Sequence, residues 1–351
     1  MDKTFVGFHT RLADHEVVDK FIDFIENHLA PMDFNAVIIE LNPGYTYRCF
    51  PQYSTGTITY EDLQKIAAAC RAKGIEPIPL VQCLSHQSNF TGGPWPLYKD
   101  HPEFLETPYV NDEQYWPDLY VYSWCPSNDG IYDYIFPMMD EIIEAMDAKT
   151  VHIGMDEVFD IGEETCPLCK GKDKAELFAR TTKILHDHLE EKGIKMMMWG
   201  DRLLNWRECG CGIWDADRFG MWPAFDMEDK VTRDIIITDW HYDPNPYCFP
   251  SVEKFMKGGF TVLPSFGGEV DQVKAFWSCC LEYLWLGRKE HWKGKIGGML
   301  FTHWTPMTEK CIDELIAGMN GADTSAYGPF SSARVGEVIA QVEPKAKNFR
   351  K

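Results

Sequence analysis

Residues 150–160 read TVHIGMDEVFD, in which a short apolar run is followed at once by two adjacent carboxylates. The run from Thr150 to Ile153 predicts a buried strand, and Asp156 and Glu157 follow its carboxyl end. Like charges side by side repel, and partial desolvation at a strand end makes ionising both groups harder still. One interpretation is an N-cap and a first-turn acid of the next helix, which are common after a strand. The other is a pair of catalytic carboxylates.

The succession of strand, loop and amphipathic helix recurs along the whole chain. Strands that alternate with helices in this way favour a parallel sheet. Eight such strands predict an α/β fold, a single-domain (β/α)8 TIM barrel. An open doubly wound sheet is the alternative, but no glycine-rich phosphate loop follows the first strand. The predicted strands are Thr4–Thr10, Asn35–Leu41, Ile75–Gln82, Thr150–Met155, Lys195–Trp199, Asp234–Asp239, Phe260–Leu263 and Ile296–Phe301.

Amphipathic patterns between the strands predict the helices. Thr59 is a candidate N-cap, because an acid, Asp62, stands three residues later. We expect residues 1–318 to form the catalytic barrel, and residues 319–351 to add a C-terminal helix and a tail that pack on it. Residues 200–233 show more loop than helix. The predicted helices are Val17–Leu29, Tyr60–Lys73, Tyr132–Met146, Lys174–Lys192, Val270–Gly287 and Ala333–Val342.

The chain is acidic, with a formal net charge of -20 over 351 residues. Nucleic acids and anionic membranes bind basic faces, so we expect neither as a partner. No segment resembles a signal peptide, and no apolar run is long enough to span a bilayer. The 12 scattered cysteines are typical of reduced, buried thiols and not of a disulfide framework. These features predict a cytoplasmic protein, and a homodimer is one oligomeric state that the sequence leaves open.

Aromatic residues gather in the long loops that follow the predicted strands. In a barrel these loops form the catalytic face. The chain has 12 tryptophans, and the flat face of a tryptophan covers the C–H face of a pyranose ring. A sugar-binding pocket therefore explains many of them, with core filling as the alternative. For Trp285, which stands on a predicted helix, core filling is the preferred interpretation.

Four motifs occur in an order and at a spacing that a known family shares. They are EPIPLVQCLSHQSNF at 76–90, HIGMDEV at 152–158, MMMWGDRLL at 196–204 and THW at 302–304. Together they resemble glycoside hydrolase family 20, the β-N-acetylhexosaminidases, whose signature is His-x-Gly-Gly-Asp-Glu. The resemblance extends over about residues 4 to 318. The most similar variant is the short hexosaminidase D type, a barrel without the usual N-terminal accessory domain.

The resemblance implies removal of terminal β-linked N-acetylhexosamine, GlcNAc or GalNAc or both, from a glycan, without a cofactor. Most retaining glycosidases use two carboxylates, whereas in this family the substrate's own 2-acetamido oxygen attacks the anomeric carbon and forms an oxazolinium ion. Glu157 would be the general acid and later the base, with a raised pKa. Asp156 would accept the acetamide N–H and stabilise the developing positive charge. Tyr242, in DWHYD, would hydrogen-bond the acetamide carbonyl.

The same resemblance implies the other substrate contacts. Three tryptophans would form walls around the acetyl methyl group and the sugar face, and an aspartate would take a sugar hydroxyl. Two histidines would form a polar network near Glu157, although a purely supporting role is equally open for each. The expected substrate-binding residues are Trp199, Trp240 and Trp304 as walls, Asp201 for the hydroxyl, His86 and His152 for the network, and Trp124 and Gln82.

Three positions depart from the family pattern. The first strand lacks the arginine that binds the sugar's O3 and O4, since Val6 stands before Gly7; Arg11, at the other end of the strand, could substitute. The second signature glycine is Met155, and the glutamate that often follows the last tryptophan is Pro306. The preference between GlcNAc and GalNAc is therefore left open.

Two cysteine clusters suggest a second kind of site. CPLC follows the acidic pair, and CGC follows the fifth predicted strand, so the two clusters would lie on adjacent barrel loops. The spacing of the first is standard for half of a zinc site, whereas that of the second is tighter than usual. Four ordinary reduced thiols are the alternative, and we favour it on sequence alone. The ligands of a structural zinc would be Cys166, Cys169, Cys209 and Cys211.

Three other functions are compatible with the pattern. A non-catalytic sugar-binding barrel would gain nothing from an acid with a raised pKa. A metal-dependent hydrolase would bring His9, His86 and His152 together at strand ends. An ordinary two-carboxylate glycosidase would use a nucleophile elsewhere, such as Glu40 or Asp239, and would act on sugars that lack a 2-acetamido group.

Overall fold

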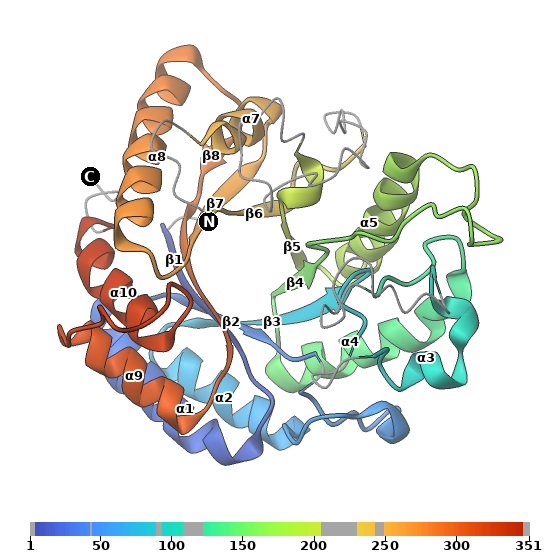
Figure 1. The fold of residues 1–351 in the computed structure, drawn as a ribbon, viewed down its shortest axis with the longest axis horizontal. Helices are drawn as coiled ribbons and strands as arrows, with labels where there is room; N and C mark the ends of the chain where they lie inside the picture. The colour runs from blue at the N-terminus through green and yellow to red at the C-terminus, as the bar shows by residue number, and fades with distance from the viewer. Residues whose placement is uncertain are drawn as a thin grey trace.

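Parallel strands close into a barrel in the computed structural model, which describes residues 4–42, 44–88, 93–107, 122–204, 230–242 and 249–346. The first seven strands pair in chain order, and the last strand pairs with both the seventh and the first, so the ring closes (Figure 1). The predicted TIM barrel is confirmed. The strands are β1 (Phe5–Arg11), β2 (Ala36–Glu40), β3 (Glu76–Cys83), β4 (Thr150–Gly154), β5 (Lys195–Trp199), β6 (Ile236–Trp240), β7 (Thr261–Phe266), β8 (Lys295–Ile296) and β9 (Gly298–Pro306).

Two pieces of strand fill the eighth position of the barrel. β8 pairs with the first residues of β7, whereas β9 pairs with the last residues of β7 and with β1. Gly298 begins β9 with a φ of 150°, and a Cβ atom there would lie 1.9 Å from the carbonyl oxygen of Phe5. Only glycine permits this approach. The strand predicted at 296–301 is therefore interrupted near its start, and it also extends beyond its predicted end.

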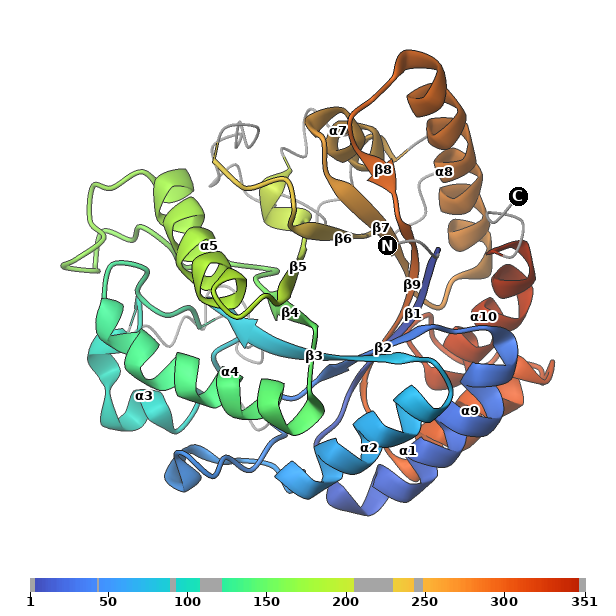
Figure 2. The same ribbon diagram turned by 180° about the vertical axis from the view of Figure 1, so that it is seen from behind.

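Helices surround the barrel, as Figure 2 shows from behind. The six predicted helices are present, and the first continues beyond α1 as a π-helical turn over Ile25–Leu29. The sequence did not predict α3, α7 and α9, because short segments give a weak periodic signal. The helices are α1 (Val18–Phe24), α2 (Tyr60–Ala72), α3 (Leu97–Asp100), α4 (Tyr132–Met146), α5 (Lys174–Glu190), α7 (Pro250–Gly258), α8 (Val270–Glu290), α9 (Glu309–Met319) and α10 (Ser332–Ala346).

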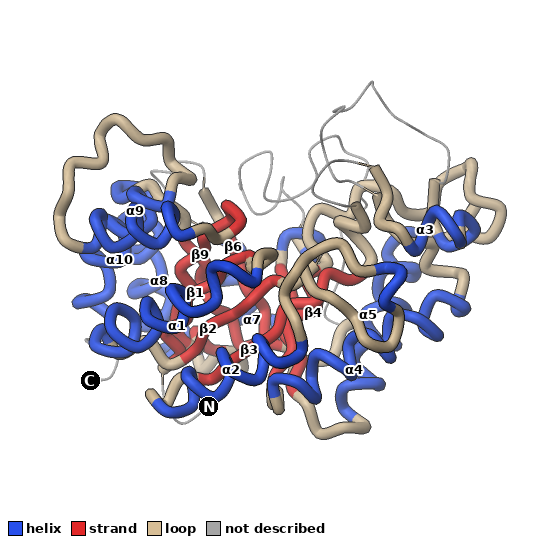
Figure 3. Tube along the Cα trace, turned by 90° about the horizontal axis from the view of Figure 1, so that it is seen from below, coloured by secondary structure: helices blue, strands red, loops and turns tan. Residues whose placement is uncertain are grey.

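Side chains alternate along each strand between the barrel interior and the layer of helices. The outward side chains join the helices in the larger hydrophobic core. The inward side chains form a separate cluster, which includes Ile38, Leu80, Met197 and Trp199. Loops that connect strands to helices lie together at one end of the barrel, on the upper side of Figure 3. Inward side chains at the carboxyl ends of the strands therefore face one common opening.

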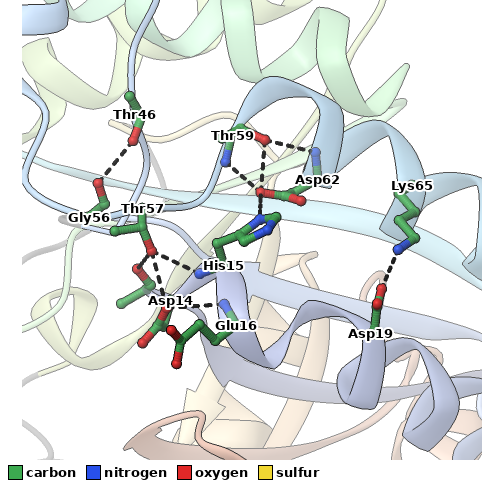
Figure 4. A network of polar contacts seen from close by, with 11 residues as sticks. Asp14, His15, Glu16, Asp19, Thr46, Gly56, Thr57, Thr59, Asp62 and Lys65 are labelled. Carbon is green, nitrogen blue, oxygen red and sulfur yellow. Dashed lines mark hydrogen bonds and ion pairs between the residues drawn. The ribbon is translucent and has the colours of Figure 1, made fainter.

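The start of α2 is fixed by the network of polar contacts in Figure 4. The Thr59 side chain accepts the Asp62 amide hydrogen bond, and the Asp62 carboxylate accepts the Thr59 amide in return. This capping box confirms the prediction for the two residues. A ring nitrogen of His15 also lies 2.8 Å from Asp62 Oδ2. The bond ties the loop after β1 to the helix after β2.

The C-terminal helix α10 lies beside α9 and also packs on α8 and β9 (Figure 1). Ser332 Oγ lies 2.9 Å from His303 Nε2, and His303 Nδ1 lies 3.1 Å from Thr10 Oγ1. Burial lowers the pKa of His303 to about 3, so this bridge is neutral. Just before the helix, the ring of Phe330 packs edge-on against Tyr242 at a centroid distance of 5.5 Å. The C-terminal segment thus reaches the face of the barrel that holds the site.

The interpretation of Trp285 as a core residue is wrong. It is 60% exposed on the outer face of α8, because the inner face of that helix is already filled by residues such as Phe276 and Tyr283. The Lys289 ammonium lies 5.0 Å from the indole ring centre, which is a cation–π contact. Among the helices that the structure describes, none combines the length and the apolar composition needed to cross a membrane.

Candidate active site

The turn after β4 carries the two carboxylates on a strained backbone. Gly154, Met155 and Glu157 have φ angles of 66°, 68° and 48°, all in the left-handed region. Residues other than glycine adopt such angles at a cost of about 1–3 kcal/mol each, and such strain concentrates at functional sites. Met155, at the position where the resemblance implies a second glycine, adopts a backbone conformation that favours glycine, although its side chain is fully buried.

Gly154 makes room for Gln82 from the end of β3. A Cβ atom on Gly154 would lie 1.8 Å from Gln82 Oε1. Gln82 Nε2 in turn donates a hydrogen bond to Asp156 Oδ1 at 3.2 Å. The signature glycine therefore acts through the glutamine: it lets an amide from the neighbouring strand hold one oxygen of the buried aspartate.

His86, in the loop after β3, lies between the two carboxylates. Its Nε2 atom is 3.3 Å from Asp156 Oδ2 and 3.5 Å from Glu157 Oε2. His86 is itself left-handed, with a φ of 54°. The neighbouring Gln87 fixes this turn by donating to the carbonyl oxygens of Gln82 and Ser85 at 3.0 and 2.8 Å. Two strained turns on adjacent strands thus bring three ionisable groups together.

The three groups shift the pKa of one another in different directions. Burial opposes charge on His86, but the charges of Asp156 and Glu157 outweigh it and raise the pKa of His86 to about 9. Burial also opposes charge on Asp156, yet His86 and the Gln82 hydrogen bond lower the pKa of that carboxyl. For Glu157 burial dominates and raises the pKa, although His86 opposes the rise. The surroundings thus favour the charged forms of His86 and Asp156 and the protonated form of Glu157.

Asp201, just after β5, holds the catalytic turn. Its Oδ2 atom accepts the Glu157 backbone N–H at 2.9 Å and the Arg202 Nε–H at 2.9 Å. Burial raises the pKa of Asp201 to about 7 against the opposing charge of Arg202. The expectation was a hydrogen bond from Asp201 to a sugar hydroxyl. The contacts make Asp201 a positioning residue for Glu157. Its other oxygen, Oδ1, is buried without a partner among the described residues, so the contact with a sugar hydroxyl stays a prediction.

His152, on β4, is a neutral packing residue. Its Nδ1 accepts the Gly154 N–H at 3.0 Å. Thr238 donates its own proton to the Met198 carbonyl, so its oxygen accepts the Nε2–H of His152 at 2.8 Å. Burial lowers the pKa of His152 to about 3. Both ring nitrogens are therefore used within the barrel, and of the two expected network histidines only His86 contacts the carboxylates.

Aromatic rings line the barrel interior at the ends of β5, β6 and β9. The Trp199 ring lies between His152 and Trp304, at centroid distances of 4.6 and 5.3 Å. The Trp240 ring stacks on Tyr242 at 5.3 Å and 18°. The indole N–H groups of Trp199 and Trp240 are buried and find no acceptor among the described residues. Buried donors are usually paired, so these two are suited to an acceptor on a ligand.

The Tyr242 hydroxyl lies at the centre of a short relay of hydrogen bonds. It accepts the Trp304 indole N–H at 2.7 Å and lies 2.9 Å from Thr302 Oγ1. Thr302 donates its own proton to the Phe266 carbonyl at 2.6 Å. The Tyr242 proton therefore points at Thr302, and rotation of the O–H bond would redirect it toward a substrate.

Trp124 and Asp239, two residues singled out in the sequence, pack against helices. Trp124 is fully buried, packs on Tyr132 of α4 and donates its backbone N–H to the Leu84 carbonyl. Its indole N–H is buried and finds no acceptor among the described residues, so its contact with a substrate stays a prediction. Asp239, one candidate nucleophile, accepts a hydrogen bond from Ser251 of α7 at 2.7 Å. It therefore faces the helices and not the barrel interior.

Glu40 and Arg11, at the ends of β2 and β1, do face the interior. Arg11 Nε lies 3.4 Å from Glu40 Oε1, and His9 Nε2 lies 3.6 Å from Glu40 Oε2. Burial opposes charge on Glu40, but Arg11 and His9 lower its pKa. Val6 packs in the outer core, so an arginine at that position would not reach the opening. Arg11 reaches the interior, where it pairs with Glu40. It is therefore a better candidate for contacts with sugar hydroxyls than an arginine at position 6 would be.

The predicted cysteine sites are only partly within the described residues. Cys166 and Cys169 come together with Cys125 and Glu106, neither of which the sequence singled out as a ligand. Cys209 and Cys211 lie outside the described residues, so their part in the predicted zinc set stays a prediction. The three-histidine site of a metal-dependent hydrolase is not formed by the described residues, in which His86 groups with Asp156 and Glu157 but not with His9 or His152.

Sequence reasoning assigned no role to several neighbours of the site. Gln87, Arg202 and Thr302 lie within the motifs that carry the resemblance, so their place in those motifs could have suggested them. Cys125 and Glu106 approach Cys166 and Cys169 only through the fold, so no local spacing could predict them. The residues that were missed are Gln87, Arg202, Thr302, Cys125 and Glu106.

Comparisons with known proteins agree with this geometry. The chain is 26% identical over 144 residues to a β-hexosaminidase of Akkermansia muciniphila, a match that covers 39% of this chain and 25% of that protein. The chitobiase of Flavobacterium johnsoniae superposes with a TM-score of 0.62 at 18% identity, covering 99% of this chain and 52% of that one. A β-N-acetylhexosaminidase of Bacteroides fragilis gives 0.57 at 14% identity, covering 99% and 71%.

The chain spans 25% of the length of that curated relative and 52% of the chitobiase. At such low identities, the likeness to the solved structures shows the barrel fold alone. The family comparison goes further, because residues 36–263 match the catalytic domain of glycosyl hydrolase family 20. That match contains the acidic pair, His86, Asp201 and Tyr242. The chain belongs to glycosyl hydrolase family 20.

Proposed function

We propose that this chain removes terminal β-linked N-acetylhexosamine, GlcNAc or GalNAc or both, from glycans with retention of configuration. One observation carries the proposal: Asp156 and Glu157 share His86 as a partner, while the pKa of Asp156 is lowered and that of Glu157 is raised. Two adjacent carboxyl groups with opposite pKa shifts are suited to two different tasks. One can donate a proton while the other carries a charge.

Glu157 is the general acid in this proposal. As the glycosidic bond breaks, its carboxyl group gives a proton to the leaving oxygen. The 2-acetamido oxygen of the substrate forms the new bond to the anomeric carbon, so the intermediate is an oxazolinium ion and no bond to the protein forms. Water then attacks the anomeric carbon from the side of the departed group and gives its proton to Glu157, while the bond between the anomeric carbon and the acetamide oxygen breaks and the acetamide is restored. The acid is thereby restored for the next cycle.

Asp156 is the orienting residue. Its carboxylate accepts the acetamide N–H and offsets the positive charge that develops on the oxazolinium ring. Burial makes this interaction stronger than it would be in water. The Gln82 amide and the His86 ring keep Asp156 ionised and fix its orientation before substrate arrives. This role requires Asp156 to stay ionised throughout the reaction, and its lowered pKa supports that requirement.

Tyr242 completes the acetamide contacts in this proposal. Rotation of its O–H bond from Thr302 to the acetamide carbonyl directs that oxygen at the anomeric carbon. Trp240, which stacks on Tyr242, and Trp304, which donates to it, form the walls for the acetyl group. Arg11 is assigned to the sugar hydroxyls. No cofactor takes part, since a proton and a neighbouring amide do all the chemistry.

A cytoplasmic location and a homodimer stay predictions of this proposal. Free, buried thiols at Cys70, Cys83 and Cys280 support a reducing compartment. A non-catalytic sugar-binding barrel and a two-carboxylate glycosidase that uses Glu40 are the competing functions. Glu40 is better placed than Asp239 to act as a nucleophile, because Glu40 faces the barrel interior.

Hydrolysis of three aryl β-glycosides separates these functions. The substrates carry GlcNAc, GalNAc or glucose on the same phenol, so that only the sugar differs. We expect the two acetamido sugars to react and the glucoside to be inert, because glucose has no neighbouring amide. Equal rates on the glucoside, together with loss of activity in Glu40→Gln, would establish the two-carboxylate function. Binding of all three sugars without turnover would establish the non-catalytic one.

A further inference from the structure

Three thiols and one carboxylate meet between the loops that follow β3 and β4. Cys125 Sγ lies 3.5 Å from Cys166 Sγ and 3.4 Å from Cys169 Sγ. With a carboxylate oxygen of Glu106, the ligand atoms all lie within 4.8 Å of one another. We propose that Glu106, Cys125, Cys166 and Cys169 bind a structural zinc ion that joins these two loops.

None of the four side chains reaches the surface. Glu106 and Cys169 are 0% exposed, and Cys125 and Cys166 are 1% and 2% exposed. Glu106 Oε1 accepts the Glu163 amide hydrogen bond at 2.8 Å. Its Oε2 atom is buried and has no hydrogen-bond partner among the described residues. Burying a carboxylate oxygen without a partner is costly, and a cation at the centre of the cluster would remove that cost.

The sulfur separations fit a shared metal better than a disulfide. An S–S bond is about 2.05 Å long, far shorter than the contacts seen here. A tetrahedral zinc with Zn–S bonds of about 2.3 Å holds its sulfur atoms about 3.8 Å apart. The observed separations of 3.4 and 3.5 Å are close to that value. Cys166 and Cys169 also have the two-residue spacing with which one turn commonly supplies two zinc ligands.

The ligand chemistry selects zinc among the common metals. Thiolates are soft ligands and disfavour magnesium and calcium, whereas zinc accepts sulfur and carboxylate oxygen in the same tetrahedral site. Ser127 Oγ lies 3.2 Å from Cys169 Sγ, and Lys172 Nζ donates to that same oxygen at 3.0 Å. The Cys169 thiol donates its proton to that oxygen, and binding of the ion would release this proton. The Glu163 amide fixes the orientation of the Glu106 carboxylate.

The site would stabilise the loop that begins with the catalytic turn. Cys166 and Cys169 lie in the same loop as Glu157, and Glu106 lies in the loop that also contains His86. Next to Glu106, Thr107 Oγ1 donates to Asp160 Oδ2 at 2.9 Å, which is a second contact between these loops. The argument for zinc rests on the cluster alone and holds whichever sugar the chain acts on.

The first test is the metal content of the full chain as purified. The protein is expressed without added metal, kept reduced, freed of any affinity tag and passed over a chelating resin before elemental analysis. We expect one zinc per chain. Removal of the ion with a strong chelator should lower the thermal unfolding midpoint, and restoring zinc should restore the midpoint. This measurement uses the wild-type protein, so it does not depend on whether a variant folds.

Variants then identify the ligands. Cys125→Ala and Cys169→Ala should each lower the zinc content at least tenfold, and Glu106→Gln should speed zinc loss to a chelator at least tenfold. Cys70→Ala is the matched control, because Cys70 is equally buried on α2 but belongs to no such cluster among the described residues. It should retain the full zinc content.

Several outcomes would overturn the proposal. One is a wild-type protein that holds less than a tenth of an equivalent of zinc both as purified and after dialysis against zinc. A second is full zinc content in both Cys125→Ala and Cys169→Ala. A third is loss of zinc in Cys209→Ala or Cys211→Ala with retention in Glu106→Gln, which would replace the carboxylate by another thiolate. A fourth is a thiol titration in denaturant that finds two of the three cysteines joined in a disulfide.

Discussion

A Cβ atom on Gly154 would lie 1.8 Å from Oε1 of Gln82, so any larger residue at 154 has to displace the Gln82 amide. We expect Gly154→Ala to displace Gln82 and with it Asp156. A displacement of about 1 Å in such a site can cost about 100-fold in rate. The measurement is kcat/KM on an aryl β-N-acetylglucosaminide, together with the unfolding midpoint.

Gly193→Ala is the control for this substitution. Gly193 has a φ of 69°, close to the 66° of Gly154, but a Cβ atom there would meet nothing within 4 Å. Both variants therefore carry the same backbone strain, and only Gly154→Ala carries the collision. Gly193→Ala should lose stability and keep its activity. Equal activity in the two variants would show that the contact with Gln82 does not matter for catalysis.

The two carboxylates should respond differently to the leaving group. Glu157→Gln removes the proton donor, which typically contributes about 100- to 10,000-fold. That loss should be large for a substrate with a weakly acidic phenol and small for one with a strongly acidic phenol, which departs without a proton. Asp156→Asn should lose about 100- to 1,000-fold on both substrates, because it acts on the acetamide. The measurement is kcat/KM on this pair of aryl glycosides, and a similar leaving-group dependence in the two variants would contradict the assignment.

His86→Gln should move both limbs of the pH profile of kcat/KM to higher pH. The His86 charge persists up to a pKa of about 9 and lowers the pKa of both Asp156 and Glu157. Without that charge, Asp156 ionises at a higher pH, which shifts the acidic limb upward. Glu157 also keeps its proton to a higher pH, which shifts the alkaline limb upward.

The control for this prediction is His188→Gln. His188 lies on α5, where its Nε2 atom is 2.8 Å from Asp140 Oδ1, and it takes no part in the site. Its substitution should leave both limbs in place. If His86→Gln shifted either limb to lower pH, the imidazolium between the carboxylates would be the wrong description.

Asp201→Asn should weaken both the fold and the catalytic turn. Asp201 and Arg202 are 2% exposed, so the substitution leaves a buried guanidinium without its neighbouring carboxylate. Breaking a buried ion pair in this way costs about 3–5 kcal/mol. Chemical denaturation measures that cost, while kcat measured well below the unfolding midpoint reports on the Glu157 turn. Unchanged stability would mean that the pair is not ionised in the folded protein.

The barrel strands could be predicted closely because they are buried on both faces. Such strands appear in the sequence as short, continuous apolar runs, and the predicted Lys195–Trp199 coincides with β5. The eighth strand shows the limit of this signal. Its apolar residues predict one strand, but the interruption at Gly298 depends on the carbonyl of Phe5, which lies at the other end of the chain.

Without the family resemblance, the sequence pairs site residues only where they share one motif. Asp156 and Glu157 stand together in the sequence, so their pairing needs no fold. Gln82 and Asp156 are 74 residues apart, and His152 and Thr238 are 86 apart. Because the first pair is so far apart in the chain, the sequence could not show that Gly154 makes room for Gln82. Because the second pair is far apart, it could not show that His152 is neutral. Met155 departs from the family in sequence, and the sequence could not show that its backbone adopts an angle that favours glycine.

His86 and Asp156 carry opposite charges, and the raised pKa of Glu157 favours its neutral, protonated form. A neutral sugar binds that form without moving a proton. A sugar mimic with a permanent positive charge at the anomeric position pairs best with ionised Glu157, so its binding expels a proton. Its inhibition constant, measured across pH, should fall as the pH rises and become constant above the pKa of Glu157. Cationic inhibitors would thus favour the form of the enzyme with ionised Glu157, whereas turnover of its substrates needs the form with protonated Glu157.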